Sequence, residues 1–236
     1  ARYPNSGWLR MDQGTSTTLT DGDLTRPDGY WTGAKAVIRS TNWSYDITAI
    51  SGFSNGMLTF PTIHHEPGNY HWGYFLCDKL SELDVPNEWY YDEQAGMLYL
   101  EAPGNSDPNT LQVEAAVKAS GANISWNRTC IEVQDLAFRY QTEAGVTING
   151  AHHIVVSGCS FQNMYHGISS SGSHNSVLNS TFTDIQASGI VMVDDSSTCS
   201  GNQLNNIALV LGAGEIGWGY FGISTMGSGN TISDNR

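Results

Sequence analysis

The feature that most constrains this chain is a repeat in its second half, where a strand-like segment that opens with glycine returns at a fixed interval. The segments read GVTING, GISSSG, GIVMVD and GISTMG, and their first glycines are Gly145, Gly167, Gly189 and Gly222. Successive glycines are 22, 22 and 33 residues apart. This interval matches one coil of a β-solenoid and is too short for a propeller blade. The repeat therefore predicts an all-β chain of stacked parallel coils from about residue 131 onward.

Alternation within these segments predicts which side chains face the interior. In a strand, every second side chain points to the same side. One inward ladder is expected to hold Val146, Ile168, Ile190 and Ile223, whereas Thr147, Ser169, Val191 and Ser224 face outward. A helical interpretation fails because Gly, Ser, Thr and Asn dominate this region and no helical period is present. Three asparagines that precede strands are expected to hydrogen-bond along the turns: Asn175, Asn202 and Asn230.

The third interval is longer than the others, which indicates insertions. The sequence suggests a long turn over residues 194–201 and a long loop over residues 210–221. These segments should rise at opposite edges of the face that the glycine-led strands form. Insertions on a repeat scaffold commonly shape its binding face.

The front half shows no such period. Its clearest element is an aromatic hairpin over residues 88–100, with a turn that ends at Gly96. We expect a smaller β-rich segment over residues 1–118, followed by coils over residues 119–236. The last residues, TISDNR, begin a further coil. The chain is therefore expected to be truncated, and missing coils or a partner chain should cover the open edge.

The net charge of the chain indicates which classes of ligand it can bind. Asp and Glu number 23 against 10 Lys and Arg, so the formal net charge is −13. Such a chain repels phosphate backbones, which argues against nucleic acid and favours a neutral or lightly charged ligand. No apolar run approaches the roughly 20 residues of a membrane span. Few lysines among many Gly, Ser, Thr and Asn residues indicate a secreted or cell-surface protein.

Carboxylates in the two expected insertions are the candidate catalytic residues. Glycoside hydrolysis needs one carboxyl group to protonate the leaving oxygen and a second as base or nucleophile. The acids in the insertions are Asp194, Asp195 and Glu215. The alternative is that these are solvated loop acids or turn caps. We expect no cofactor and assign no metal ligands. Adjacent carboxylates also suit Ca²⁺, so a calcium site at Asp194–Asp195 is the alternative.

Aromatic side chains near the same strands are the candidate substrate-binding residues. They are Tyr165, His166, Trp218 and Tyr220. Their rings could stack on sugars, and the alternative is packing that stiffens the loop.

Lyase or epimerase chemistry needs a cation to hold a uronate. From residue 131 onward the chain has no Lys and only Arg139 and Arg236, which weighs against this chemistry in the coils.

Several stretches resemble a large class of secreted bacterial right-handed parallel β-helix proteins with the pectate-lyase-like fold. They are ARYPN, the segment with EWYYDEQAGMLYLEAP, IEVQDLAFRY and the glycine-led coils. The resemblance implies a right-handed helix with an auxiliary β segment before it, and a polysaccharide-active protein. It identifies no catalytic residues in this sequence. We therefore expect a glycoside hydrolase or a fragment of one. The alternative is a non-catalytic carbohydrate-binding or cell-surface module, and the third option is a polysaccharide lyase or epimerase.

Overall fold

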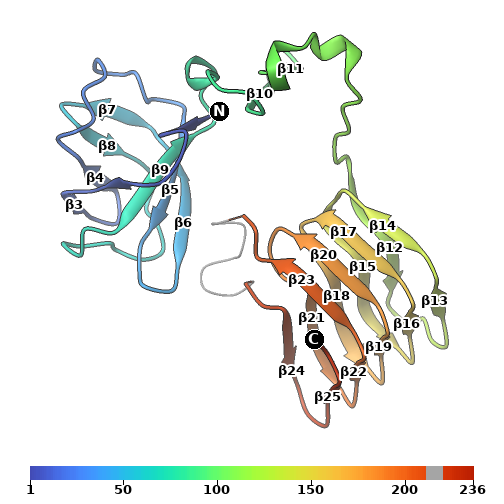
Figure 1. Ribbon diagram of the computed structural model, residues 1–236. Coiled ribbons are helices and arrows are strands. Elements are labelled where there is room, and N and C mark those ends of the chain that lie inside the picture. Colours follow the sequence, from blue (N-terminus) through green and yellow to red (C-terminus); the bar gives the residue numbers. More distant parts are fainter. Residues whose placement is uncertain (211–219) are drawn as a thin grey trace. The chain divides into compact units, whose positions relative to one another are not determined.

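The computed structural model describes residues 1–210 and 220–236 (Figure 1). It divides into two compact units, Ala1–Val113 and Glu114–Arg236. Besides strands, the described residues form short 3₁₀ helices at Leu80–Glu82, Pro103–Asn105 and Pro108–Thr110. No helix in the described ranges has the length and apolar character that a membrane crossing requires. The protein is therefore all-β, as the sequence predicts.

The first unit consists of antiparallel strands. One sheet has the order β1-β9-β5-β6 with β2 beside β9, a second has the order β3-β4-β8-β7, and β10 and β11 form the predicted hairpin. The bounds are β1 Arg2–Tyr3, β2 Leu9–Arg10, β3 Gln13–Gly14, β4 Thr18–Thr20, β5 Lys35–Arg39, β6 Tyr45–Ala49, β7 Gly52–Ser54, β8 Met57–Thr59, β9 Gly73–Cys77, β10 Trp89–Asp92 and β11 Met97–Leu100. Trp31 and Tyr74 are the largest buried side chains of this unit's own core.

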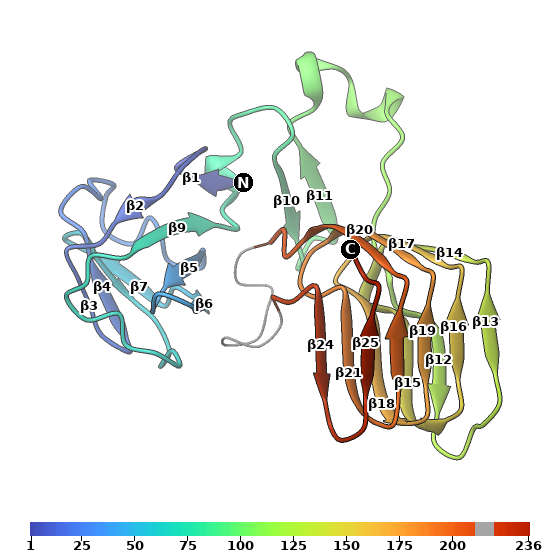
Figure 2. The ribbon, with the colours of Figure 1, turned by 60° about the horizontal axis from the view of Figure 1, so that its bottom comes forward.

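The second unit is a parallel β-solenoid with three sheets, which Figures 1 and 2 show as stacked coils. Sheet 1 holds β12 Lys118–Ser125, β15 Gln141–His152, β18 His166–Ser173, β21 Ile190–Asp195 and β24 Ile223–Met226. Sheet 2 holds β13 Glu132–Gln134, β16 Val155–Ser157, β19 Ser176–Leu178, β22 Thr198–Ser200 and β25 Thr231–Ser233. Sheet 3 holds β14 Ala137–Arg139, β17 Ser160–Met164, β20 Thr181–Ile185 and β23 Gln203–Ile207.

The register of sheet 1 confirms the predicted inward ladder. Val146 pairs with Ile168, Ile168 with Ile190, and Ile190 with Ile223. The first three are fully buried. The stack starts one strand before the visible repeat, because β12 pairs with β15 and places Ala122 beside Val146.

The prediction of an insertion over residues 194–201 was wrong. Ser173 pairs with Asp195 and Leu178 with Ser200, so this turn has the same length as the one before it. All of the extra length follows Ile207, which still pairs with Ile185 at the normal interval. The backbone N–H of Phe221 then donates to Ser188 Oγ, 33 residues earlier. Only the second predicted insertion exists, and its residues 211–219 lie outside the described ranges.

Each corner of the coil turns on a residue with positive φ, and these residues form three columns. The columns are Cys130, His153, His174, Ser196 and Gly229 between sheets 1 and 2; Asp135, Gly158, Asn179, Gly201 and Asp234 between sheets 2 and 3; and Tyr140, Asn163, Asp184 and Asn206 at the ends of the sheet 3 strands, before the chain turns to sheet 1. Asn, Asp, His and Gly adopt this left-handed conformation more readily than other residues. The polar composition of the turns therefore has a backbone cause.

The predicted turn asparagines do hydrogen-bond from coil to coil, in two separate ladders. Between sheets 1 and 2, Asn175 Oδ1 accepts from the backbone of Ile154 at 3.0 Å, and Asn230 Oδ1 accepts from Ser197 at 2.9 Å. Between sheets 2 and 3, Asn202 Oδ1 accepts from the backbone of Ser180 at 3.0 Å. These bonds satisfy buried amides at corners where the sheet ladder is interrupted.

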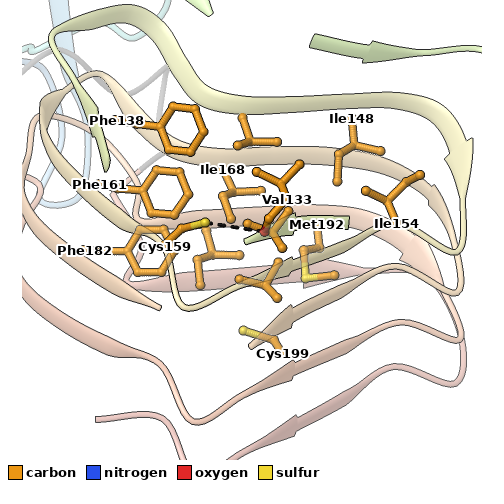
Figure 3. Packing of buried hydrophobic residues seen from close by; sticks show 14 of the residues in the cluster. Val133, Phe138, Ile148, Ile154, Cys159, Phe161, Ile168, Phe182, Met192 and Cys199 are labelled. Carbon is orange, nitrogen blue, oxygen red and sulfur yellow. Dashed lines mark hydrogen bonds between the residues drawn. The ribbon is translucent and has the colours of Figure 1, made fainter. Parts of the chain in front are cut away.

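A column of phenylalanines fills the interior opposite the glycines of sheet 1 (Figure 3). Phe138 stacks on Phe161, and Phe161 on Phe182, at centroid distances of 5.2 and 4.7 Å. A Cβ added at Gly167 would lie 2.4 Å from Phe182 Cδ1. Gly145 and Gly167 are therefore required, because the rings of Phe161 and Phe182 occupy the space that a side chain would need.

Candidate functional site

The outer face of sheet 1 is uncharged along its centre. Two rows of outward residues cross it: Asn123, Thr147, Ser169, Val191 and Ser224 in one, and Ser125, Asn149, Ser171, Val193 and Met226 in the other. Hydroxyl and amide groups predominate on the first three strands. Ser171 Oγ donates to Asn149 Oδ1 at 3.4 Å across neighbouring coils. This face offers hydrogen-bonding groups of both polarities and no formal charge.

Aromatic residues gather at the edge where the strands of sheet 1 begin. Tyr165 immediately precedes β18 and His166 is its first residue, and their ring centroids lie 4.5 Å apart with planes inclined by 70°. The backbone of Ser188 donates to His166 Nδ1 at 3.1 Å, which orients the imidazole. Ala187 N donates to Tyr165 O, so Ala187 lies one coil on, and the Phe221–Ser188 bond places Tyr220 one coil further. The structure thus brings Tyr165, His166 and Tyr220 to one edge.

Two other residues, Trp218 and Glu143, bear on the composition of this edge. Trp218, the fourth predicted aromatic, lies outside the described residues. The sequence analysis did not select Glu143 as a site residue. Ala144 pairs with His166, which places the exposed Glu143 one coil before Tyr165. Its position relative to the glycine of its own strand matches that of Tyr165, and this signal was present in the repeat.

A polar row that the sequence did not suggest crosses the opposite edge of sheet 1. His152, Ser173 and Asp195 occupy one register position on successive coils. His152 Nδ1 and Ser173 Oγ are 2.8 Å apart, and Asp195 Oδ1 accepts from the backbone of Ser228 at 2.6 Å. Their spacing of 21 and 22 residues follows the repeat and could have revealed them.

Asp194 lies inside the solenoid. It is 1% exposed, and its Oδ2 accepts from Ser170 Oγ at 2.7 Å and from Asn175 Nδ2 at 3.4 Å. Asp195, the next residue, is exposed on the outer face. Neighbouring strand residues point to opposite sides, so the two carboxylates do not converge on one cation. Within the described ranges, no group of three or more His, Cys, Asp or Glu side chains could hold a metal ion.

Comparison with known proteins identifies the architecture. The family described as the right-handed β-helix region matches residues 104–236, more than half of the chain. The chain belongs to the right-handed β-helix family. A solved structure of a glycoside hydrolase is similar to all of this chain and to 76% of its own, at 11% sequence identity and a TM-score of 0.43. No curated protein matches the sequence.

Within the described residues, sheet 1 of this β-helix places exposed carboxylates singly. Glu143 lies at the beginning of the strands of sheet 1, and Asp195 at their end two coils away. The outward neighbours of Asp195 across the coils are Ser173 and the backbone of Ser228. Within the described residues, sheet 1 thus lacks the carboxylate pair that hydrolysis requires at about 5–9.5 Å. Glu215, the third predicted acid, lies outside those residues.

Proposed function

We propose that the β-helix unit binds a neutral or lightly charged polysaccharide along the outer face of sheet 1. The observation that carries this proposal is the uncharged rows of that face, bordered by Tyr165, His166 and Tyr220 at one edge. Sugar hydroxyl groups donate and accept hydrogen bonds, as the Ser, Thr and Asn side chains of these rows do. Aromatic rings supply an apolar surface with a polar tip beside them.

Charge supports a neutral rather than an acidic glycan. The chain carries a formal charge of −13, and Arg139 lies on β14 in sheet 3, away from the proposed face. An anionic polymer would meet repulsion and no cationic side chain in the central rows. This arrangement disfavours the lyase and epimerase alternatives. A secreted or cell-surface location, where polysaccharides are found, is part of the proposal.

Hydrolysis of the glycan stays a prediction. Of the three predicted catalytic acids, Asp195 is the one that the described structure exposes on sheet 1. A single carboxylate does not complete either glycosidase geometry. Binding without cleavage is therefore the function that the described geometry supports best.

Affinity electrophoresis tests the proposal. The full chain is run in native gels that contain glucomannan, xylan, mixed-linkage glucan or polygalacturonate. We expect retardation by at least one neutral polysaccharide and none by polygalacturonate. Replacing Tyr165 with alanine should clearly reduce the retardation, whereas Tyr70→Ala, an exposed aromatic of the first unit, should leave it unchanged. Unretarded migration in every neutral gel would overturn the proposal.

A reducing-sugar assay on the same polysaccharides separates a hydrolase from a binding module. If the chain cleaves the glycan with Asp195 as a catalytic acid, Asp195→Asn should remove the release of reducing ends and leave gel retardation intact. Retardation of the wild-type chain without release would assign a binding module.

A further inference from the structure

The first unit contains a cavity of about 870 Å³ beside the aromatic hairpin. One wall is β10, with Trp89 and Tyr91, followed by Glu93 in the turn. The other wall lies where β5 begins and β9 ends, with Lys35 and Asp78. Its size lies within the range of about 300–1,000 Å³ that is typical of small-molecule sites. The two walls are distant in sequence, so the cavity is a product of the fold.

The strand that forms the first wall presents aromatic surface and backbone groups. Trp89 and Tyr91 are 60% and 47% exposed, although large aromatic side chains usually bury most of their area. The terminal amino group of Ala1 donates a hydrogen bond to Trp89 O, so this carbonyl points away from β11. In an antiparallel pair the backbone groups alternate in direction, so those of Tyr91 also face outward at this edge. The wall thus combines apolar rings with main-chain donors and acceptors.

Three carboxylates line the cavity, those of Asp78, Asp92 and Glu93, together with the cationic groups of Lys35 and Ala1, and the Ala1 amino group is bonded to Trp89 O. Lys35 Nζ is 2.8 Å from Asp78 Oδ2, so the cation is paired. Asp92 Oδ1 accepts two turn amides, from Gln94 and Ala95, at 3.0 Å each. An ionised carboxylate has about four lone-pair sites, so Asp92 and Asp78 keep capacity for further donors. The lining therefore suits a ligand that offers hydroxyl donors and an apolar face, and it opposes an anion.

We propose that this cavity is a second glycan-binding site, which takes a short neutral oligosaccharide between Trp89 and the Lys35–Asp78 pair. A sugar ring presents C–H groups on its faces and hydroxyl groups at its rim, which match the aromatic and carboxylate groups of the lining. The site lies entirely within the first unit and is independent of the sheet 1 proposal. It would hold a glycan chain or chain end separately from the β-helix.

Cys77 provides a local probe, because this free thiol lines the cavity. Cys130, an exposed free thiol of the β-helix unit, is the internal control. The full chain is alkylated with iodoacetamide in the presence of cellohexaose, xylohexaose, mannohexaose, hexagalacturonate or chitosan hexamer, and labelling of each cysteine is followed by peptide mass spectrometry. We expect at least one neutral hexaose to slow labelling of Cys77 several-fold while labelling of Cys130 is unchanged.

Two variants connect the protection to the proposed wall. Trp89→Ala should remove the protection, whereas Trp43→Ala, a similarly exposed tryptophan of the same unit that does not line the cavity, should keep it. Tyr165→Ala should also keep it, since this residue lies in the second unit, immediately before β18. The proposal is overturned if no neutral hexaose protects Cys77, if chitosan or hexagalacturonate alone protects it, or if protection survives in Trp89→Ala.

Discussion

The ring of Phe161 lies flat on the ring of Phe182, with centroids 4.7 Å apart and planes inclined by 4° (Figure 3). This distance equals the spacing of neighbouring strands, about 4.7–4.9 Å, so each ring marks one coil. The two residues also pair directly in sheet 3. The same residue type thus recurs at the same interior position, which holds successive coils in a single register.

Replacing Phe161 with alanine should therefore strongly destabilise the β-helix unit. Removing a buried phenylalanine side chain typically lowers the free energy of unfolding by about 3–5 kcal/mol. Urea unfolding followed by circular dichroism measures the effect. Ser160→Ala, at the exposed neighbouring position, should stay within about 0.5 kcal/mol of the wild type. Equal midpoints for the two variants would contradict the stacked core.

A charge at the inward ladder should prevent folding, while the same charge one residue on should not. Ile168 is fully buried, whereas Ser169 faces outward. Burying an unpaired carboxylate costs several kcal/mol, which is comparable with a total stability of about 5–15 kcal/mol. We expect Ile168→Asp to lose its cooperative thermal transition and Ser169→Asp to keep it. The reverse order would contradict the register of sheet 1.

The glycine column should tolerate alanine only at its last coil. A Cβ at Gly167 would lie 2.4 Å from both Phe182 Cδ1 and Gly189 O, whereas a Cβ at Gly222 meets its nearest neighbour, Leu204, at 3.9 Å. Overpacking typically costs about 1–3 kcal/mol. Gly167→Ala should lower the unfolding midpoint in urea, and Gly222→Ala should leave it nearly unchanged. Similar losses in both variants would argue against steric conflict as the cause.

Stability should fall at alkaline pH partly through Cys199. Burial raises the pKa of this thiol to about 11, and a hydrogen bond from Asn202 partly offsets the effect. In the unfolded chain a thiol ionises near pH 8.5. The unfolded state thus releases a proton first, so the stabilisation is complete below that pH and is lost as pH rises toward 11. Urea titrations between these values should show a shallower decline for Cys199→Ala than for the wild type, and parallel declines would contradict the burial.

The interior of the coils could be predicted from sequence because a period of two within a period of 22 residues fixes each side chain's direction. Asp194 shows where this reasoning stopped short. Ile190 was predicted to face inward, and alternation continued over four residues places Asp194 inward as well, but the sequence analysis assigned residues 194–201 to a turn. The extra residues between Gly189 and Gly222 were assigned to two segments, 194–201 and 210–221, although all of them follow Ile207.

Other features depend on contacts that no local pattern encodes. The hairpin of β10 and β11 was predictable from its aromatic strands and turn, but the cavity beside it was not. Its second wall comes from Lys35 and Asp78, which pairing with distant strands brings there. The row of His152, Ser173 and Asp195 was hidden by a different cause, because it becomes visible only after the coils are aligned in register.

The most direct test of the central claim is to place the same charged side chain on two different faces of the β-helix and to measure glycan binding. Ser169→Lys places the charge on the outer face of sheet 1, and Thr181→Lys places it at an exposed position of sheet 3. Isothermal titration is carried out with the neutral polysaccharide that retards the wild-type chain most strongly. If sheet 1 carries the polysaccharide, Ser169→Lys weakens binding at least tenfold, about 1.4 kcal/mol, and Thr181→Lys does not. Equal affinities in both variants, or a loss confined to Thr181→Lys, would contradict the assignment.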